Sequence, residues 1–117
     1  MIPQGVQVFV ALEPVNLNFS FERLAGFARE RMGYEARSGA LFLFFGKRRD
    51  ALKVLFFDGT GMCIFYKRLD RGTFRLPEPL SPEAAHVEVD QATLDALLDG
   101  IDLGPPLPRP KAPRRLH

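Results

Sequence analysis

Eight lysine and arginine side chains are concentrated between residues 47 and 75. Three aspartates lie in the same segment, so its formal net charge is +5, whereas residues 76–103 hold seven acidic and no basic side chains, a net charge of −7. Such segregation of positive and negative charge suggests binding partners, because a surface with both charges intermixed would be equally soluble. Basic side chains on a two-stranded ribbon can contact the phosphates of a nucleic acid. The candidate nucleic-acid-binding residues are Lys47, Arg48, Arg49, Lys53, Lys67, Arg68, Arg71 and Arg75.

A second interpretation of these cations stays open: they are solvated strand ends and protect a sheet edge from aggregation. Side chains alternate along the expected strand 62–69, so Lys67 and Arg68 emerge on opposite faces and only one of them can join a given patch. From the residues alone, this protective role is the favoured interpretation.

The stretch DGTG at 58–61 resembles a phosphate-binding loop in composition, but its surroundings indicate a turn. A Walker-type loop enters a helix through Gly-Lys-Ser/Thr, whereas a strand is expected to follow here. Asp-Gly is a common hairpin signal, so we predict that Asp58, Gly59 and Gly61 form one turn and that Gly72 belongs to the next. Asp58 has no neighbouring carboxylate to complete a magnesium site.

The remaining reactive side chains do not form a pattern typical of an enzyme. Cys63 lies between hydrophobic residues, and neither His86 nor His117 is near it in sequence to act as its base. One cysteine and two histidines are too few for a zinc site. We therefore predict no catalytic residue, no metal and no cofactor.

The apolar runs and turn signals predict a small α+β domain. Its antiparallel β-meander would be packed by an N-terminal helix and a short C-terminal helix. Strands are expected at 6–12, 40–46, 52–58, 62–69, 73–76 and 86–89, and helices at 20–33 and after Asp90.

Both helices carry recognisable end signals. Ser20 is the expected N-cap of the first helix and Gly33 its left-handed C-cap, while Asp90 and Gly100 play these parts in the second. Helical spacing predicts that the first helix packs against the core through Phe21, Leu24, Ala25, Ala28 and Met32.

The domain is expected to span residues 1–103, followed by a proline-rich basic tail at 104–117 that we expect to be extended and mobile. No stretch approaches the roughly 18 apolar residues of a membrane span, and the N-terminus lacks the features of a signal peptide. The single cysteine fits a reducing compartment. A cytoplasmic protein is therefore expected.

The central segment contains unlike residue types at fixed offsets, which in order are Gly39, Leu41, Phe42, Phe44, Asp50, Lys53, Leu55, Asp58, Gly59, Gly61, Tyr66, Lys67, Arg68, Leu69, Arg71, Gly72, Phe74 and Pro77. In these residues the chain resembles the TnpB accessory proteins of the IS 66 family of bacterial insertion sequences, which are distinct from the RNA-guided nuclease of the same name. The resemblance covers roughly residues 1–103 and departs at Phe56 and Phe57, where the family usually has Trp, and at Leu17–Phe19, where it usually has Met-Arg-Lys.

This resemblance implies a role in DNA transposition beside a transposase and a small DNA-binding protein of the same element. With this resemblance, phosphate binding by the basic segment becomes slightly favoured over the interpretation that its cations protect a sheet edge. The alternative is a protein–protein adaptor whose acidic region, residues 76–103, docks on the transposase without direct DNA binding. The sequence leaves the oligomeric state open.

Overall fold

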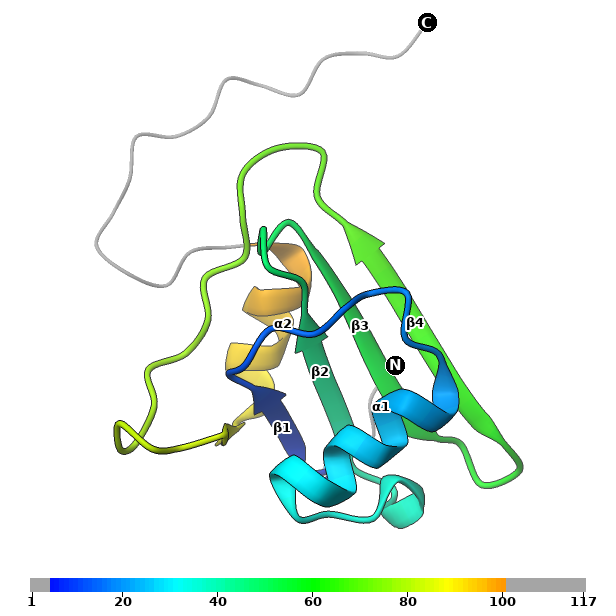
Figure 1. Cartoon of the computed structure of the whole chain (residues 1–117). Coiled ribbons are helices and arrows are strands. Elements are labelled where there is room, and N and C mark those ends of the chain that lie inside the picture. The colour runs from blue at the N-terminus through cyan, green and yellow to red at the C-terminus, as the bar shows by residue number, and fades with distance from the viewer. Residues whose placement is uncertain (1–4, 101–117) are drawn as a thin grey trace, which may run out of the picture.

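A computed structural model describes residues 5–100 and contains one five-stranded sheet (Figure 1). The strands lie in the order β4-β3-β2-β1-β5, with β1 parallel to β2 and every other neighbouring pair antiparallel. Their bounds are β1 Val8–Ala11, β2 Leu41–Phe45, β3 Ala51–Phe57, β4 Met62–Arg68 and β5 His86–Val89.

Helices cover both faces of the sheet, which explains why β2 is buried along its whole length. Helix α1, Phe21–Phe27, contributes Leu24 to the core on one face, where Phe42 and Phe44 point. Helix α2, Gln91–Asp99, packs on the other face, where Leu43 and Phe45 point. The continuous apolar run of β2 is typical of a strand covered on both sides.

The connection from β1 to β2 crosses over one face of the sheet, as parallel neighbours require (Figure 1). It contains α1, a π-helical continuation at Ala28–Met32 and a 3-10 turn at Ala36–Ser38. Gly33 ends the π-helical segment with φ 84°, a left-handed conformation that glycine adopts without steric conflict.

Helix α2 has the end signals that the sequence predicts. Asp90 accepts a hydrogen bond from the Thr93 N–H at 2.8 Å. Hydrogen bonding from the Thr93 side chain, and then from its N–H, lowers the pKa of the Asp90 carboxyl. Gly100 is left-handed, with φ 74°. Ser20 occupies the N-cap of α1, but its side chain makes no capping hydrogen bond.

The α+β class is confirmed, with three corrections. The sheet is mixed, because the antiparallel meander extends only over β2, β3 and β4. Residues 73–76 are irregular and form no strand, since Phe74 leaves the sheet edge and packs its ring against Phe45. Phe21 is 43% exposed, because the buried stripe of the helix runs through Leu24, Ala28 and Met32 instead.

The predicted tail at 104–117 and the boundary before it lie outside the described residues. Between residues 5 and 100, no helix is long and apolar enough to cross a membrane.

Candidate nucleic-acid interface

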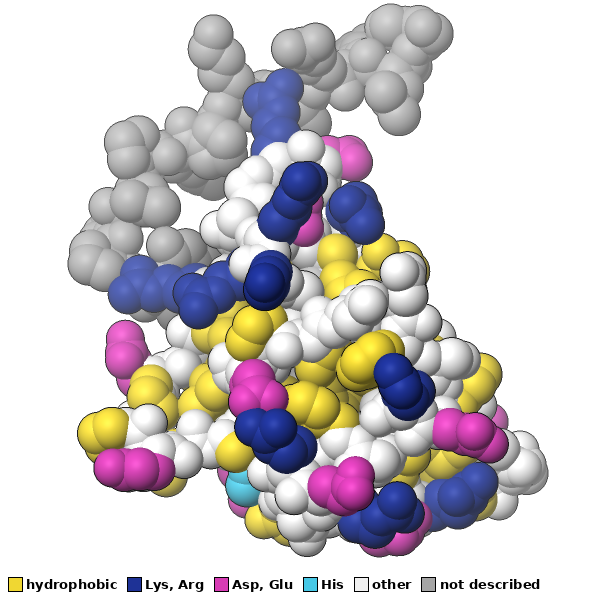
Figure 2. All heavy atoms as spheres, in the orientation of Figure 1, with side chains coloured by type: hydrophobic (Ala, Val, Ile, Leu, Met, Phe, Trp, Pro, Cys, Tyr) yellow, Lys and Arg dark blue, Asp and Glu magenta, His cyan; other side chains and the backbone are white. Residues whose placement is uncertain are grey.

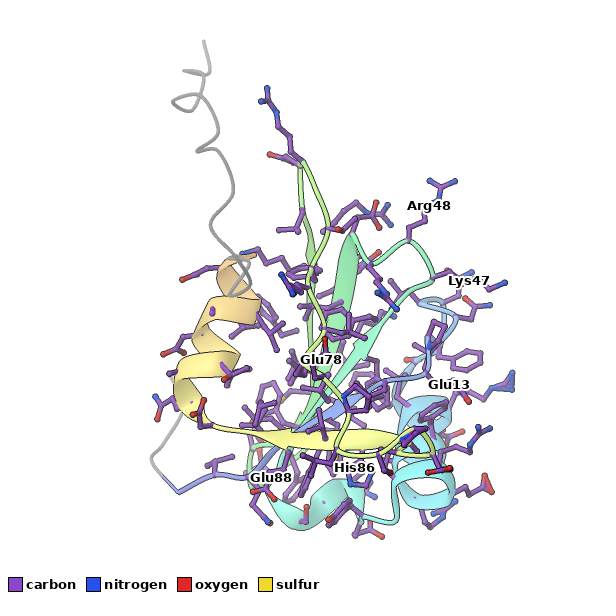
Figure 3. All side chains as sticks on the ribbon, turned by 90° about the vertical axis from the view of Figure 1, so that its left-hand side faces the viewer. Glu13, Lys47, Arg48, Glu78, His86 and Glu88 are labelled. Carbon is purple, nitrogen blue, oxygen red and sulfur yellow. The ribbon has the colours of Figure 1, made fainter. Side chains whose placement is uncertain are left out.

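The β2–β3 turn presents three cations to solvent. Lys47, Arg48 and Arg49 are all exposed, and Figure 3 shows Lys47 and Arg48 pointing away from the body of the protein. The turn is held by a hydrogen bond from the Arg49 N–H to the Gly46 carbonyl at 3.0 Å. Arg49 itself has φ 58°, the one non-glycine residue with positive φ between residues 5 and 100.

A hollow of about 560 Å³ lies beside this turn, and three cations from two hairpin ends line it. Lys47 and Arg48 come from the β2–β3 turn, while Arg68 comes from the end of β4. The far wall is the segment after β1, including Asn16, and one carboxylate, Asp50, also lines the hollow. The arrangement therefore offers a concave, mainly cationic surface at one end of the sheet.

The side chain of Arg68 is oriented within this group by Tyr66. Its Nη2 donates to the Tyr66 hydroxyl at 2.9 Å, and this hydrogen bond, with the charge of Asp50, raises the pKa of the Arg68 guanidinium. Arg68 therefore keeps its positive charge at every physiological pH, as arginine ordinarily does.

The loop after β4 brings further cations to the same end of the molecule. The Leu69 N–H donates to the Asp50 carbonyl at 2.7 Å, and the Phe74 N–H donates to the Arg49 carbonyl at 2.6 Å. These bonds hold residues 69–74 against the β2–β3 turn, so the exposed Arg71 and Arg75 lie in the same region. Figure 2 shows Lys and Arg side chains gathered there, at the upper end of the view.

Lys53 and Lys67 are placed differently from the other candidates, because both are half-buried and hydrogen-bonded to the backbone. Lys53 Nζ donates to the Phe19 carbonyl at 2.9 Å and lies 5.4 Å from the centre of the Tyr66 ring. Lys67 Nζ donates to the Leu98 carbonyl on the opposite face of the sheet. Neither lines the hollow.

The DGTG stretch forms the β3–β4 turn. Asp58 Oδ1 accepts hydrogen bonds from the Thr60 N–H at 2.8 Å and the Gly61 N–H at 2.9 Å. These two bonds and a third from the Thr60 hydroxyl lower the pKa of Asp58 to about 2. Gly59 has φ 103°. The Asp58 carboxylate is therefore already hydrogen-bonded within its own turn.

The second predicted turn contains Gly72, with φ 72°. Cys63 lies in β4 with its Sγ 3.6 Å from Asp58 Oδ2; partial burial and the Asp58 charge raise the pKa of its thiol, the opposite of activation. Between residues 5 and 100, no group of three or more His, Cys, Asp or Glu side chains is placed to hold a metal ion.

The acidic side chains that follow β4 are spread over several places and do not gather on one side. Figure 3 shows Glu88 and His86 on β5, far from Lys47 and Arg48 in the view. Six of the seven predicted acidic residues are described, and all six are exposed: Glu78, Glu83, Glu88, Asp90, Asp95 and Asp99. Glu78 and Glu83 line a second hollow together with the candidate Arg49 and with the ion-paired Arg31 and Glu13.

The sequence interpretation missed the segment 14–17, which forms one wall of the cationic hollow. Its signal was the order strand, helix, strand over residues 6–46, which favours parallel pairing of the two strands. Parallel strands end at the same edge of a sheet, so the segment after β1 lies beside the β2–β3 turn. A hydrogen bond from the Val15 N–H to the Phe45 carbonyl at 2.9 Å fixes this contact.

Comparison with known proteins agrees with the pattern of residues. The family model described as IS66 Orf2 like protein matches residues 6–107. Two relatives come from Sinorhizobium fredii (strain NBRC 101917 / NGR234). Uncharacterized protein y4hO is 38% identical over 104 residues, which is 87% of this chain and 88% of the relative. Uncharacterized protein y4jC is 29% identical over 99 residues, 85% of this chain and 82% of the relative.

No solved structure matches the chain. The family match covers most of the chain, including every strand, both helices and all the cations around the hollow. The chain therefore belongs to the IS66 Orf2-like family of insertion-sequence accessory proteins.

Proposed function

We propose that this protein is a non-enzymatic accessory of insertion-sequence transposition that binds DNA phosphates through its basic end. The observation that carries the proposal is that Lys47 and Arg48 of the β2–β3 turn and Arg68 at the end of β4 line the same hollow. Exposed lysine and arginine side chains that lie close together can neutralise neighbouring phosphates of a DNA backbone. If these cations were only solvated strand ends, as in the competing interpretation, they would not need to line the same hollow.

The proposed binding is largely independent of DNA sequence. Phosphate contacts position a protein on a duplex without reading bases, and base reading usually needs a helix or ribbon inserted into a groove. Helix α1 is only seven residues long, and α2 carries exposed Asp95 and Asp99, which phosphates would repel. Arg49 lines the second hollow, beside Glu78 and Glu83, and Arg71 and Arg75 lie in the loop held against the β2–β3 turn, so these three arginines extend the proposed surface at the same end of the molecule.

Lys53 and Lys67 are left out of this surface as primary contacts. Each already donates to a backbone carbonyl, and each ties β3 or β4 to a neighbouring segment. We propose that their main role is to stabilise the fold that presents the other cations.

A salt titration with matched variants tests the proposal. Each neutralised phosphate contributes about −0.9 to the slope of log affinity against log salt on duplex DNA. The variant Arg48→Ala/Arg68→Ala should flatten this slope by up to about 1.8. The control Arg29→Ala/Arg37→Ala removes the same charge from exposed sites outside the hollow and should leave the slope near the wild-type value. Equal slopes in the two variants would refute the assignment.

A second candidate function is that of an adaptor, favoured by the exposure of the acidic residues between 78 and 99. In this role these acidic residues would dock on a basic surface of the transposase of the same element. Charge reversal by Asp95→Lys/Asp99→Lys should then abolish co-purification with that transposase while leaving folding intact. If the same variant kept the complex, and the Arg48/Arg68 variant lost DNA binding, the phosphate-binding role would stand alone.

A further inference from the structure

The two edges of the sheet differ in length and in what they expose. At one edge, β5 is four residues long and is followed directly by α2. At the other, β4 is seven residues long, and no described strand pairs with its outer side. Phe65 and Tyr66, in the middle of β4, are 47% and 49% exposed. A long edge strand with exposed aromatic rings is the kind of edge that pairs with another strand.

The hydrogen-bond pattern shows which residues of β4 are available for pairing. The Asp58 N–H donates to the Gly61 carbonyl and the Leu69 N–H donates to the Asp50 carbonyl, at the two ends of the β3–β4 ladder. The register is unbroken between them, so residues 63, 65 and 67 also face β3. The intervening residues therefore direct their N–H and C=O groups outward: Met62, Ile64, Tyr66 and Arg68.

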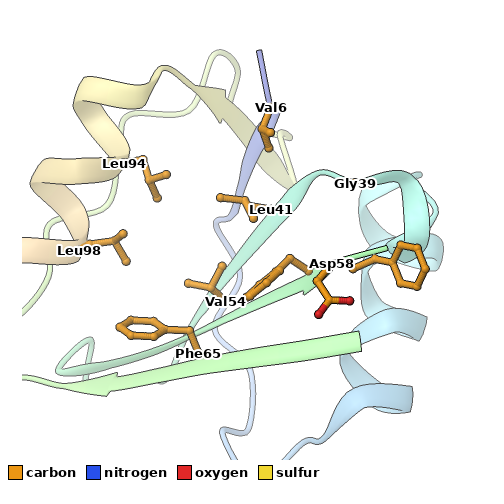
Figure 4. A pocket seen from close by; sticks show the side chains of 10 residues that line it. Val6, Gly39, Leu41, Val54, Asp58, Phe65, Leu94 and Leu98 are labelled. Carbon is orange, nitrogen blue, oxygen red and sulfur yellow. The ribbon is translucent and has the colours of Figure 1, made fainter. Parts of the chain in front are cut away.

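The side chains of β4 are divided between the two faces. Phe65 pairs with Val54 and lies on the α2 face, where it lines an apolar groove with Leu94 and Leu98 (Figure 4). Ile64 and Tyr66 lie on the α1 face, opposite Leu55 and Lys53. A strand added to this edge would meet apolar or aromatic surface on both faces.

We propose that the occupant of this edge is a second copy of the chain, paired antiparallel through β4 about a two-fold axis at Phe65. In this register Ile64 lies opposite Tyr66 of the second copy and Met62 lies opposite Arg68, so every outward-facing residue finds a hydrogen-bonding partner. The two Phe65 residues form a non-hydrogen-bonded pair, the type in which facing side chains approach most closely. Their rings join the two apolar grooves across the seam.

The pairing of Phe65 and the placement of the cations favour this register. Lys67 and Arg68 lie opposite Cys63 and Met62 of the second copy, so no cation faces another. Moving the axis to Tyr66 would place Phe65 opposite Lys67 and separate the two Phe65 rings. Moving it further, to Lys67, would bring two lysines together, which destabilises a strand pair. A shift toward the N-terminal end would place Phe65 opposite the smaller Cys63 and break the aromatic pair.

Sedimentation equilibrium over a range of protein concentrations tests the dimer. The wild type should show reversible, concentration-dependent dimers, and Phe65→Lys should be monomeric, because the two lysines would meet at the axis. The matched control is Leu80→Lys, since Leu80 is an apolar residue 90% exposed outside the strands, and it should dimerise like the wild type. A wild type that stays monomeric, or a dimer that survives Phe65→Lys, would overturn the proposal.

Cysteine cross-linking tests the register and does not depend on the lysine variant folding. In a Cys63→Ser background, Phe65→Cys should form an intermolecular disulfide on mild oxidation, because the paired positions lie within disulfide range. Ile64→Cys in the same background should not, since position 64 faces position 66. Equal cross-linking of the two variants, or cross-linking of Ile64→Cys alone, would refute the Phe65-centred pairing. Pairing of β4 with a different protein would leave both variants uncross-linked.

Discussion

The Nζ of Lys67, on the edge strand β4, donates a hydrogen bond to the main-chain carbonyl of Leu98 in the last turn of α2. The last carbonyls of a helix have no partner within the helix and carry its negative dipole end. Lys67 therefore satisfies one of these groups and joins α2 to the sheet. A residue that looks like a surface cation in the sequence is a structural link in the fold.

Replacing this link should lower stability without changing DNA binding. Lys67→Met keeps the apolar stem but loses the charged hydrogen bond, which at a half-buried site should reduce the free energy of unfolding by about 1–2 kcal/mol. Urea denaturation measures the loss. Arg71→Met is the matched control, because Arg71 is exposed in the loop after β4. It should leave stability nearly unchanged and flatten the salt dependence of binding, the reverse of Lys67→Met.

Stability should fall in acid partly through Asp58. Its three turn hydrogen bonds lower its pKa from 3.8 to about 2, so the folded state favours the charged form. A group of this kind contributes stability that is present above the unfolded pKa and is lost as pH falls from about 4 to about 2. Asp58→Asn, which does not titrate, should show a smaller loss across this window in thermal melts. Asp70→Asn removes the same charge from the next turn and should retain the wild-type loss.

Much of this fold follows from local signals. The β3–β4 hairpin was predictable because Asp58-Gly59 is a turn signal between two apolar runs, and the β2–β3 hairpin because the polar residues 47–50 separate two apolar runs. The ends of α2 were predictable because Asp90 and Gly100 act within one turn. The prediction of an antiparallel sheet was wrong at β1. The helix between β1 and β2 makes their connection a crossover, so these two strands are parallel.

The errors arose where tertiary contacts override local preference. Residues 73–76 have the composition of a strand, but the buried Phe74 is held by the Arg49 carbonyl and by the core instead of by a neighbouring strand. The eight candidate cations also could not be separated by sequence. Charge alone does not show that Lys53 and Lys67 bond to carbonyls while Arg68 lines the hollow.

The backbone of the β3–β4 turn should distinguish its two glycines. Gly59 has φ 103°, a conformation that β-branched residues rarely adopt, whereas Gly61 does not have positive φ. Gly59→Val should therefore lower the free energy of unfolding by about 1–3 kcal/mol. An added Cβ meets nothing within 4 Å at either site, so the two positions differ in backbone conformation and not in available space. Gly61→Val should therefore have the smaller effect. Chemical denaturation of both variants compares them, and equal losses would show that φ is not the cause.

The β2–β3 turn should be separable from the fold that carries it. Lys47, Arg48 and Arg49 are exposed, and the bonds that hold the turn use main-chain atoms, so replacing all three by alanine should leave the domain folded. If each cation neutralises a phosphate, the triple variant flattens the salt slope by up to about 2.7. Circular dichroism and a salt titration of duplex binding measure the two effects. A folded variant with the wild-type slope would remove this turn from the DNA surface and favour the adaptor role.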